Sequence, residues 1–187
     1  MTRSRGLGDV YKRQVMGALM QFRDELAQQH QHPSFAVNVP TLNLGCLRAG
    51  DNPNRICGHA ELQIDLRLLP GMDSDAIHKQ LEQRCHDAVA GSHTQLTVST
   101  VYPPIPPFES AADGELTTTL AALSGKAPGT VAFGTEAHFL QTLGMQTVVW
   151  GPGSIDQAHQ PNEYLEQSHI RPAIETLQQV IGRYCLA

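Results

Sequence analysis

The chain has 187 residues, of which 41% are hydrophobic and 17% charged, a composition typical of folded globular proteins rather than disordered ones. The formal net charge is −5 without a long run of one sign, so neither nucleic acid nor an anionic membrane is expected as a partner. No stretch approaches the roughly 20 apolar residues that span a bilayer. The cysteines lack CxxC spacing, which indicates reduced thiols in a cytoplasmic protein.

The first fourteen residues, MTRSRGLGDVYKRQ, differ in character from the rest of the chain, because they are basic and glycine-rich and show no apolar period. A disordered basic tail is one interpretation. We favour another, since DVYKRQ resembles a translated sequencing adapter, which makes residues 1–14 a non-native leader. On this interpretation the native polypeptide begins further upstream, and the fold is analysed from Val15.

The next segment predicts a helix followed by two strands. Val15, Leu19, Phe22 and Leu26 recur at helical spacing. A first strand is expected over residues 42–49, where Leu42, Leu44 and Cys46 alternate with the intervening positions. After the turn DNPN, residues 58–67 alternate strictly between apolar and polar side chains, which predicts a strand with one buried face and one solvated face.

A second helix and a third strand complete the first domain. The helix is expected to begin after a cap at Asp73 or Ser74 and to bury Ile77, Leu81 and Cys85. The third strand is expected over residues 96–101. The resulting order, α-β-β-α-β, is that of a ferredoxin-like βαββαβ domain that lacks its first strand.

The proline-rich segment YPPIPPF can continue neither a sheet nor a helix, so we place a domain boundary there and expect domains over residues 15–104 and 105–187. Helices are expected near residues 115–123 and 135–143, with short strands near 131 and 147–150. A last helix carries an apolar stripe, which comprises Ile170, Ile174, Leu177, Ile181 and Tyr184. This alternation indicates one edge of an α/β layer with an uncovered face.

Two loops contain candidate functional residues. In FGTEAHF, Gly134 and Thr135 open a helix, where exposed backbone N–H groups suit a carboxylate, although Thr135 as a simple helix cap explains the pattern equally well. The loop GPGSIDQAHQPNEY follows a predicted strand and contains Gly151, Gly153 and His159. A lone loop histidine is usually an ordinary surface residue, and zinc requires at least three protein ligands.

These two loops, together with TLNLGCLRAGDNPNRICGHAELQIDLRLLPGM, resemble the end of the dinuclear-metal aminoacylase and carboxypeptidase family. The resemblance extends over roughly residues 15–187. It implies a lid or dimerisation domain followed by the C-terminal part of an α/β metallohydrolase domain. It further implies two zinc or cobalt ions that activate a bridging water, a small N-acyl amino acid as substrate, and a homodimer formed through the lid.

Carried onto this sequence, the resemblance implies a role for several residues. His159 matches the last metal ligand. Asn54 is expected to approach an active site, that of the partner subunit in a dimer, and Arg67 to grip substrate. The remaining substrate-binding candidates are Gly134, Thr135, Gly151 and Gly153. As alternatives, Asn54 is an ordinary turn residue and Arg67 an ordinary solvated strand residue.

The family's HxD segment and Glu-Glu pair have no counterpart, because no histidine here is followed two residues later by Asp and no two glutamates are adjacent. We therefore expect this polypeptide by itself to be inactive. The substrate favoured by the resemblance is N-acetylornithine. The alternatives are a desuccinylase or aminoacylase of the same family, and a non-catalytic dimerisation or binding module.

Overall fold

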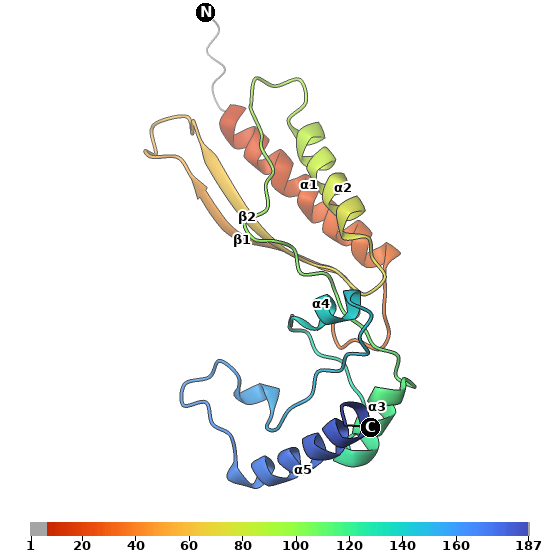
Figure 1. The fold of residues 1–187 in the computed structure, drawn as a ribbon. Coiled ribbons are helices and arrows are strands. Elements are labelled where there is room, and N and C mark those ends of the chain that lie inside the picture. The colour runs from red at the N-terminus through yellow and green to blue at the C-terminus, as the bar shows by residue number, and fades with distance from the viewer. Residues whose placement is uncertain (1–6, 187) are drawn as a thin grey trace, which may run out of the picture. The chain divides into compact units, whose positions relative to one another are not determined.

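The computed structural model describes residues 7–186, which form two compact units (Figure 1). The first comprises the described residues up to Pro107 together with Val131–Gly134, and the second comprises Phe108–Thr130 and the described residues from Thr135 onward. Among the described residues, no helix is long and apolar enough to cross a membrane. The elements are α1 (Leu7–Gln29), β1 (Thr41–Ala49), β2 (Ala60–Arg67), α2 (Ser74–Ala88), α3 (Glu115–Ser124), α4 (Ala137–Thr142), the short 3₁₀ helix η1 (Ile155–Gln157) and α5 (Gln167–Tyr184).

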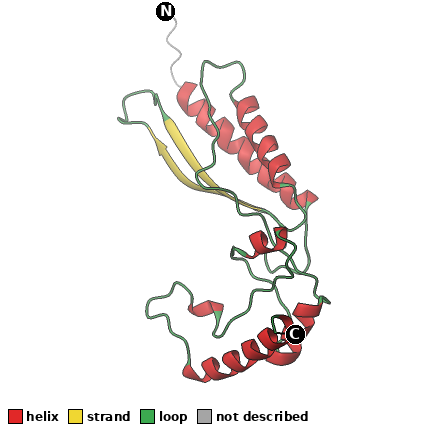
Figure 2. Ribbon diagram, viewed as in Figure 1, coloured by secondary structure: helices red, strands yellow, loops and turns green. Residues whose placement is uncertain are grey.

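The first unit packs two helices against one face of an antiparallel pair of strands (Figure 2). Phe22, Leu19 and Leu26 of α1 are its most deeply buried large side chains, each at most 2% exposed. They repeat at three- and four-residue intervals and so form one stripe along the helix. The rest of the core cluster comprises Leu42, Ile77, Leu81 and Cys85. The periodicity predicted for both helices is confirmed.

The start of α2 is fixed by a side-chain cap. Asp73 has extended backbone, and its carboxylate accepts the N–H groups of Asp75 and Ala76, both at 3.0 Å. These bonds satisfy two of the helix N–H groups that have no partner within the helix. Of the two predicted caps, the structure therefore selects Asp73 over Ser74.

One charged pair joins α1 to α2 at the border of the core. The Arg84 guanidinium lies over the Phe22 ring, 4.7 Å from its centroid, and donates a hydrogen bond to Glu25. That bond is the main reason why the pKa of the Glu25 carboxyl lies below its ordinary value. Deeper between the same helices, burial raises the pKa of the Cys85 thiol. The four cysteines are all free thiols.

A β-bulge interrupts the alternation of β1. Leu44 pairs with Ile64, but the next pair is Cys46 with Gln63, so Gly45 is the extra residue. Because paired side chains share a face, the bulge moves Cys46 to the polar face of Gln63. The pairing thus departs from the predicted alternation at Cys46, although burial still alternates there, with Cys46 half-buried and Leu47 exposed. In β2 the predicted alternation is confirmed, with half-buried apolar and exposed polar side chains.

The first helix is longer than the sequence predicts. It begins at Leu7, so residues 7–14 are helical, although their composition gives no apolar stripe. Residues 1–6 of the expected leader lie outside the described part of the chain. That residues 1–14 are a non-native leader remains a prediction.

The expected third strand does not form in the described residues. Residues 94–100 have no regular secondary structure, although Leu96 and Val98 still pack against the core. A strand requires a hydrogen-bonded neighbour, and the sheet of the described chain consists of β1 and β2. Leu96 and Val98 are thus packed without a ladder, whereas Val101 is 69% exposed. The unit is an α+β structure with a small two-stranded sheet.

The second unit contains α3, α4, η1 and α5, and the described residues form no strand there (Figure 2). The short strand predicted over residues 147–150 is wrong for the same reason as the third strand, as is the one near Val131, which lies in the first unit. The predicted helices do form, although α4 is shorter than expected. Ser110 donates a hydrogen bond to the carbonyl of Thr147, which links the segment 147–150 to the start of the unit.

Helix α5 exposes the apolar stripe that the sequence predicts. Its buried side chains are Ala173 and Thr176, each 6% exposed, which lie beside the stripe. The stripe itself is 39–50% exposed at Ile170, Ile174, Leu177, Ile181 and Tyr184. Helix α3 contacts α5, where the Tyr184 hydroxyl lies 3.0 Å from the Thr119 hydroxyl. The uncovered face expected in this region is that of a sheet, and no strand forms in the described residues of this unit.

Candidate functional site

The loop between η1 and α5 contains His159, the proposed metal ligand. The 3₁₀ helix η1, which precedes this loop, is capped by Ser154, whose hydroxyl oxygen accepts the N–H of Asp156 at 3.3 Å. His159 itself has a φ of 60°, a left-handed backbone conformation that few residues other than glycine adopt. Its N–H donates to the Glu163 carboxylate at 3.0 Å. The side chain of His159 is exposed.

The described residues do not by themselves make a metal centre. A zinc ion requires at least three protein ligands, and the described part of the chain brings no three His, Cys, Asp or Glu side chains together in a suitable group. The Asp156 carboxylate lies 3.3 Å from the Ser154 hydroxyl, and the Glu163 carboxylate accepts the His159 N–H. His159 therefore offers a single imidazole, and no metal-dependent step can be derived from these residues.

The two loop glycines differ in what they contribute. Gly153 has a φ of 97°, where a side chain is strained, and an added Cβ would lie 3.1 Å from Leu165 Cδ1. Glycine is thus required at position 153 by the backbone and by the close approach of Leu165. Gly151 has open space around it and an ordinary φ. A role for either in substrate binding remains a prediction.

Gly134 and Thr135 lie at the start of α4. The Thr135 hydroxyl oxygen accepts the N–H of Ala137 at 3.2 Å, as a capping side chain does. Gly134 has no atom within 4 Å of a Cβ built on it, so its surroundings are open. The geometry accounts for Thr135 as a cap, which the sequence offered as an alternative, and leaves the proposed contact with substrate untested.

Arg67 lies at the end of β2 and forms two interactions within the first unit. Its Nε donates to the Asp65 carboxylate at 2.8 Å, and its Nη1 donates to the carbonyl of Ala132 at 3.1 Å. The second bond brings Arg67 to the segment that leads directly into Gly134. Arg67 thereby contacts a residue that is two positions before Gly134, although Arg67 and Gly134 are 67 positions apart in the sequence. No motif or periodicity in the sequence indicates the contact with Ala132.

Asn54 lies in the loop that joins β1 to β2, where its N–H donates to the Asn52 side chain at 3.1 Å. It precedes β2, whereas Arg67 ends it. At about 3.3 Å per residue the strand spans roughly 23 Å, so Asn54 and Arg67 lie at opposite ends of it. The two residues therefore cannot hold one small substrate within one subunit.

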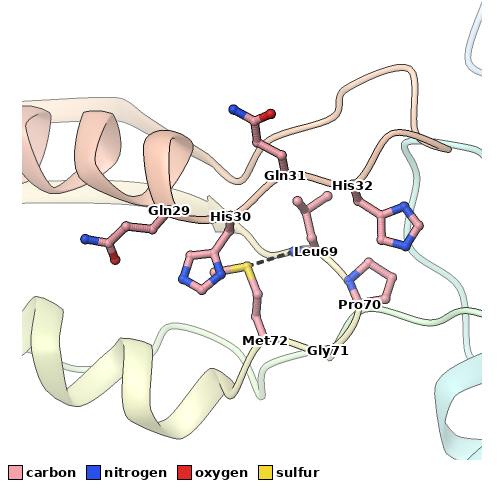
Figure 3. A pocket seen from close by; sticks show the side chains of 8 residues that line it. All are labelled: Gln29, His30, Gln31, His32, Leu69, Pro70, Gly71 and Met72. Carbon is pink, nitrogen blue, oxygen red and sulfur yellow. Dashed lines mark hydrogen bonds between the residues drawn. The ribbon is translucent and has the colours of Figure 1, made fainter.

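The cavity in Figure 3 lies elsewhere in the first unit, at the end of α1. Its volume of about 210 Å³ is below the 300–1,000 Å³ typical of ligand pockets. Figure 3 shows His30 beside Met72, whose sulfur accepts the N–H of Leu69 at 3.3 Å. None of the predicted site residues lines this cavity, which comprises Gln29, His30, Gln31, His32, Leu69, Pro70, Gly71 and Met72.

Comparison with known proteins first indicates the class of protein to which this chain is similar. Residues 13–92 match the family described as the peptidase dimerisation domain. The fold resembles the crystal structure of an M20 family metallo-carboxypeptidase from Sulfolobus solfataricus, with a TM-score of 0.56 and 14% identity, over 98% of this chain and 48% of that one. Residues 13–92 of the first unit are thus similar to a peptidase dimerisation domain, and the resemblance to the aminoacylase and carboxypeptidase family is confirmed.

At the level of individual proteins, the chain is related to acetylornithine deacetylases. It is 41% identical to that of Aliivibrio fischeri (strain MJ11) over 172 residues, which are 92% of this chain and 45% of the relative. It is 42% identical to that of Klebsiella pneumoniae (strain 342) over 171 residues, which are 91% of this chain and 44% of the relative. The match extends through both units. The chain spans somewhat less than half the length of these curated relatives.

Proposed function

We propose that residues 15–187 supply the dimerisation domain and the C-terminal part of the catalytic domain of a metal-dependent deacetylase. The reaction is the hydrolysis of N-acetylornithine to ornithine and acetate, a step of arginine biosynthesis in the cytoplasm. The observation that supports this best is the identity of 41–42% with acetylornithine deacetylases over more than nine-tenths of the chain. An identity of that extent covers the proposed site loops as well as the dimerisation domain.

In this proposal His159 is one metal ligand, and the other ligands and the general base come from outside residues 15–187. The divalent ions, zinc or cobalt, would supply a water of lowered pKa and polarise the amide oxygen. The residues of this chain contribute binding and orientation. Arg67 and Gly134 are proposed to border the substrate, because the bond from Arg67 to Ala132 holds the end of β2 against the segment that leads into Gly134. Thr135 is proposed as a further substrate-binding residue. Gly151 and Gly153 shape the loop that presents His159.

The position of Asn54 supports a dimeric enzyme. Because Asn54 and Arg67 lie at opposite ends of β2, Asn54 is proposed to reach the active site of the partner subunit. The matched dimerisation domain supports the same arrangement. Sedimentation of the chain should therefore show a homodimer, and a monomer at all accessible concentrations would contradict this part of the proposal.

The decisive experiment exchanges the matching 45% of the Aliivibrio fischeri deacetylase for residues 15–187 of this chain. The hybrid should hydrolyse N-acetylornithine, and His159→Ala should lower its kcat/KM by at least about 100-fold, because even indirect partners of a metal typically contribute 10–100-fold. His169→Ala is the matched control and should leave the rate unchanged. A folded, dimeric hybrid that is inactive, or one insensitive to His159→Ala, would contradict the proposal.

The 187-residue chain by itself is expected to be inactive, because the described residues bring no three metal ligands together. The assay is hydrolysis of N-acetylornithine in the presence of zinc or cobalt. A metal-dependent rate above the uncatalysed background would contradict this expectation.

Two alternatives remain to be separated. A desuccinylase or aminoacylase of the same family would be recognised if the hybrid preferred N-succinyl-diaminopimelate or other N-acyl amino acids. A non-catalytic dimerisation module is favoured by one observation, the family match confined to residues 13–92. It predicts a stable dimer whose assembly does not depend on His159 and a hybrid without activity.

A further inference from the structure

The segment between η1 and α5 contains two unusual backbone positions. His159 and Asn162, with φ of 60° and 64°, are the non-glycine residues with positive φ in the described chain. Asparagine visits the left-handed region readily, because its short polar side chain can hydrogen-bond locally. Histidine also adopts this conformation more often than most residues do, but at a cost in free energy that local interactions must offset.

The interaction comes from Glu163, four residues further along. Its Oε2 accepts the N–H of His159 at 3.0 Å, while its own N–H donates to the carbonyl of Gln160 at 3.1 Å. The second bond holds the backbone of Glu163 close to the turn, so its carboxylate needs to reach back only a short distance. A bond to an ionised carboxylate is stronger than one between neutral groups.

We propose that Glu163 is a positioning residue for His159. Its carboxylate holds the backbone of His159 in the left-handed conformation and thereby fixes the direction in which the imidazole leaves the loop. A change of φ to an ordinary negative value would rotate the Cα–Cβ bond and turn the imidazole away. The proposal rests on the proposed function in one respect, because His159 needs a defined direction only if it binds a ligand.

The neighbouring acidic groups are engaged elsewhere. The Asp156 carboxylate lies 3.3 Å from the Ser154 hydroxyl, and Glu166 accepts from the Ser168 hydroxyl at 3.4 Å. Of the carboxylates in this loop, that of Glu163 is therefore the one that accepts a hydrogen bond from His159. Glu166 is consequently a suitable control, since it carries the same group on the same segment.

The test uses the full 187-residue chain without metal or substrate, labelled for NMR. In the native chain the amide-to-α-proton NOE of His159 should be strong, because positive φ shortens that distance. Glu163→Ala should weaken this NOE and raise the exchange rate of the His159 amide by roughly tenfold, the effect of losing one charge-assisted bond. Glu163→Gln, which keeps an acceptor oxygen, should retain the NOE, and Glu166→Ala should change neither.

A weak NOE in the native chain would overturn the proposal, and so would an NOE and exchange rate unchanged by Glu163→Ala. Because these measurements contain neither metal nor substrate, they stand apart from the deacetylase assay. An inactive hybrid together with the expected NMR result would reject the proposed function and leave the role of Glu163 intact. The reverse combination would reject the role of Glu163 alone.

Discussion

The two units of this chain bury their apolar residues to very different degrees. In the first, stripes on α1 and α2 meet the sheet, and Phe22, Leu19 and Leu26 are almost fully enclosed. In the second, the longest helix, α5, buries Ala173 and Thr176 and leaves its large apolar side chains about half exposed. Burial of apolar area is the main source of stability. The large apolar side chains of α1 and α2 are buried within the described part of the first unit, whereas those of α5 in the second unit are not.

The sharpest test of this difference removes one large side chain from each unit. Phe22→Ala should destabilise the first unit by about 3–5 kcal/mol, because the ring is enclosed and carries Arg84 on its face. Leu177→Ala, on the exposed stripe of α5, should cost only about 0.5 kcal/mol. Both losses of stability can be measured by hydrogen exchange of each segment at increasing denaturant concentration. Equal losses would show that the stripe of α5 is covered in solution.

Thiol reactivity gives a second comparison that requires no substitution. Cys85 is 4% exposed and burial raises its pKa, whereas Cys185 is exposed. Since the thiolate is the reactive form and Cys85 must first be uncovered, Cys185 should react with iodoacetamide at least about 100-fold faster at neutral pH. Mass spectrometry of the labelled peptides measures both rates. Similar rates would mean that the core between α1 and α2 opens readily.

A smaller difference lies in how the helices begin. Helix α2 is capped by Asp73, whereas α3 and α5 start without a side-chain hydrogen bond at their caps. Asp73→Ala should therefore lower the free energy of unfolding of the first unit by about 1 kcal/mol. Ser74→Ala is the control, because the cap bonds come from Asp73. Denaturant titration compares them, and equal effects would contradict the assignment of the cap.

The features that could be predicted from the sequence are those that depend on residues close together in the chain. The stripes of α1, α2 and α5 follow from helical spacing, and Thr135 follows from the residue types favoured at helix starts. The strand expected at Leu96 could not be assessed in this way, because its existence depends on a hydrogen-bonded neighbour elsewhere in the chain. The exposure of α5 likewise depends on what packs over it.

The candidate site shows the same division. The short spacing from His159 to Glu163 is local and can be seen in the sequence, whereas the backbone need for glycine at position 153 comes from its φ of 97° in the structure. The bond from Arg67 to Ala132 joins residues far apart in the chain, and no periodicity indicates it. The sequence also offered no means of seeing that Asn54 and Arg67 lie at opposite ends of one strand.

The bulge in β1 has a consequence for changes in chain length. Gly45 is surplus to the pairing of β1 with β2, and an added Cβ there would meet its nearest atoms at 3.6 Å, an ordinary contact. If Gly45 were deleted, every other residue of β1 would keep its present partner in β2 and its present face of the sheet. Strand β1 can therefore lose a residue at position 45 without a change in the face to which its side chains point. A deletion elsewhere in the strand would move every side chain beyond it to the opposite face of the sheet.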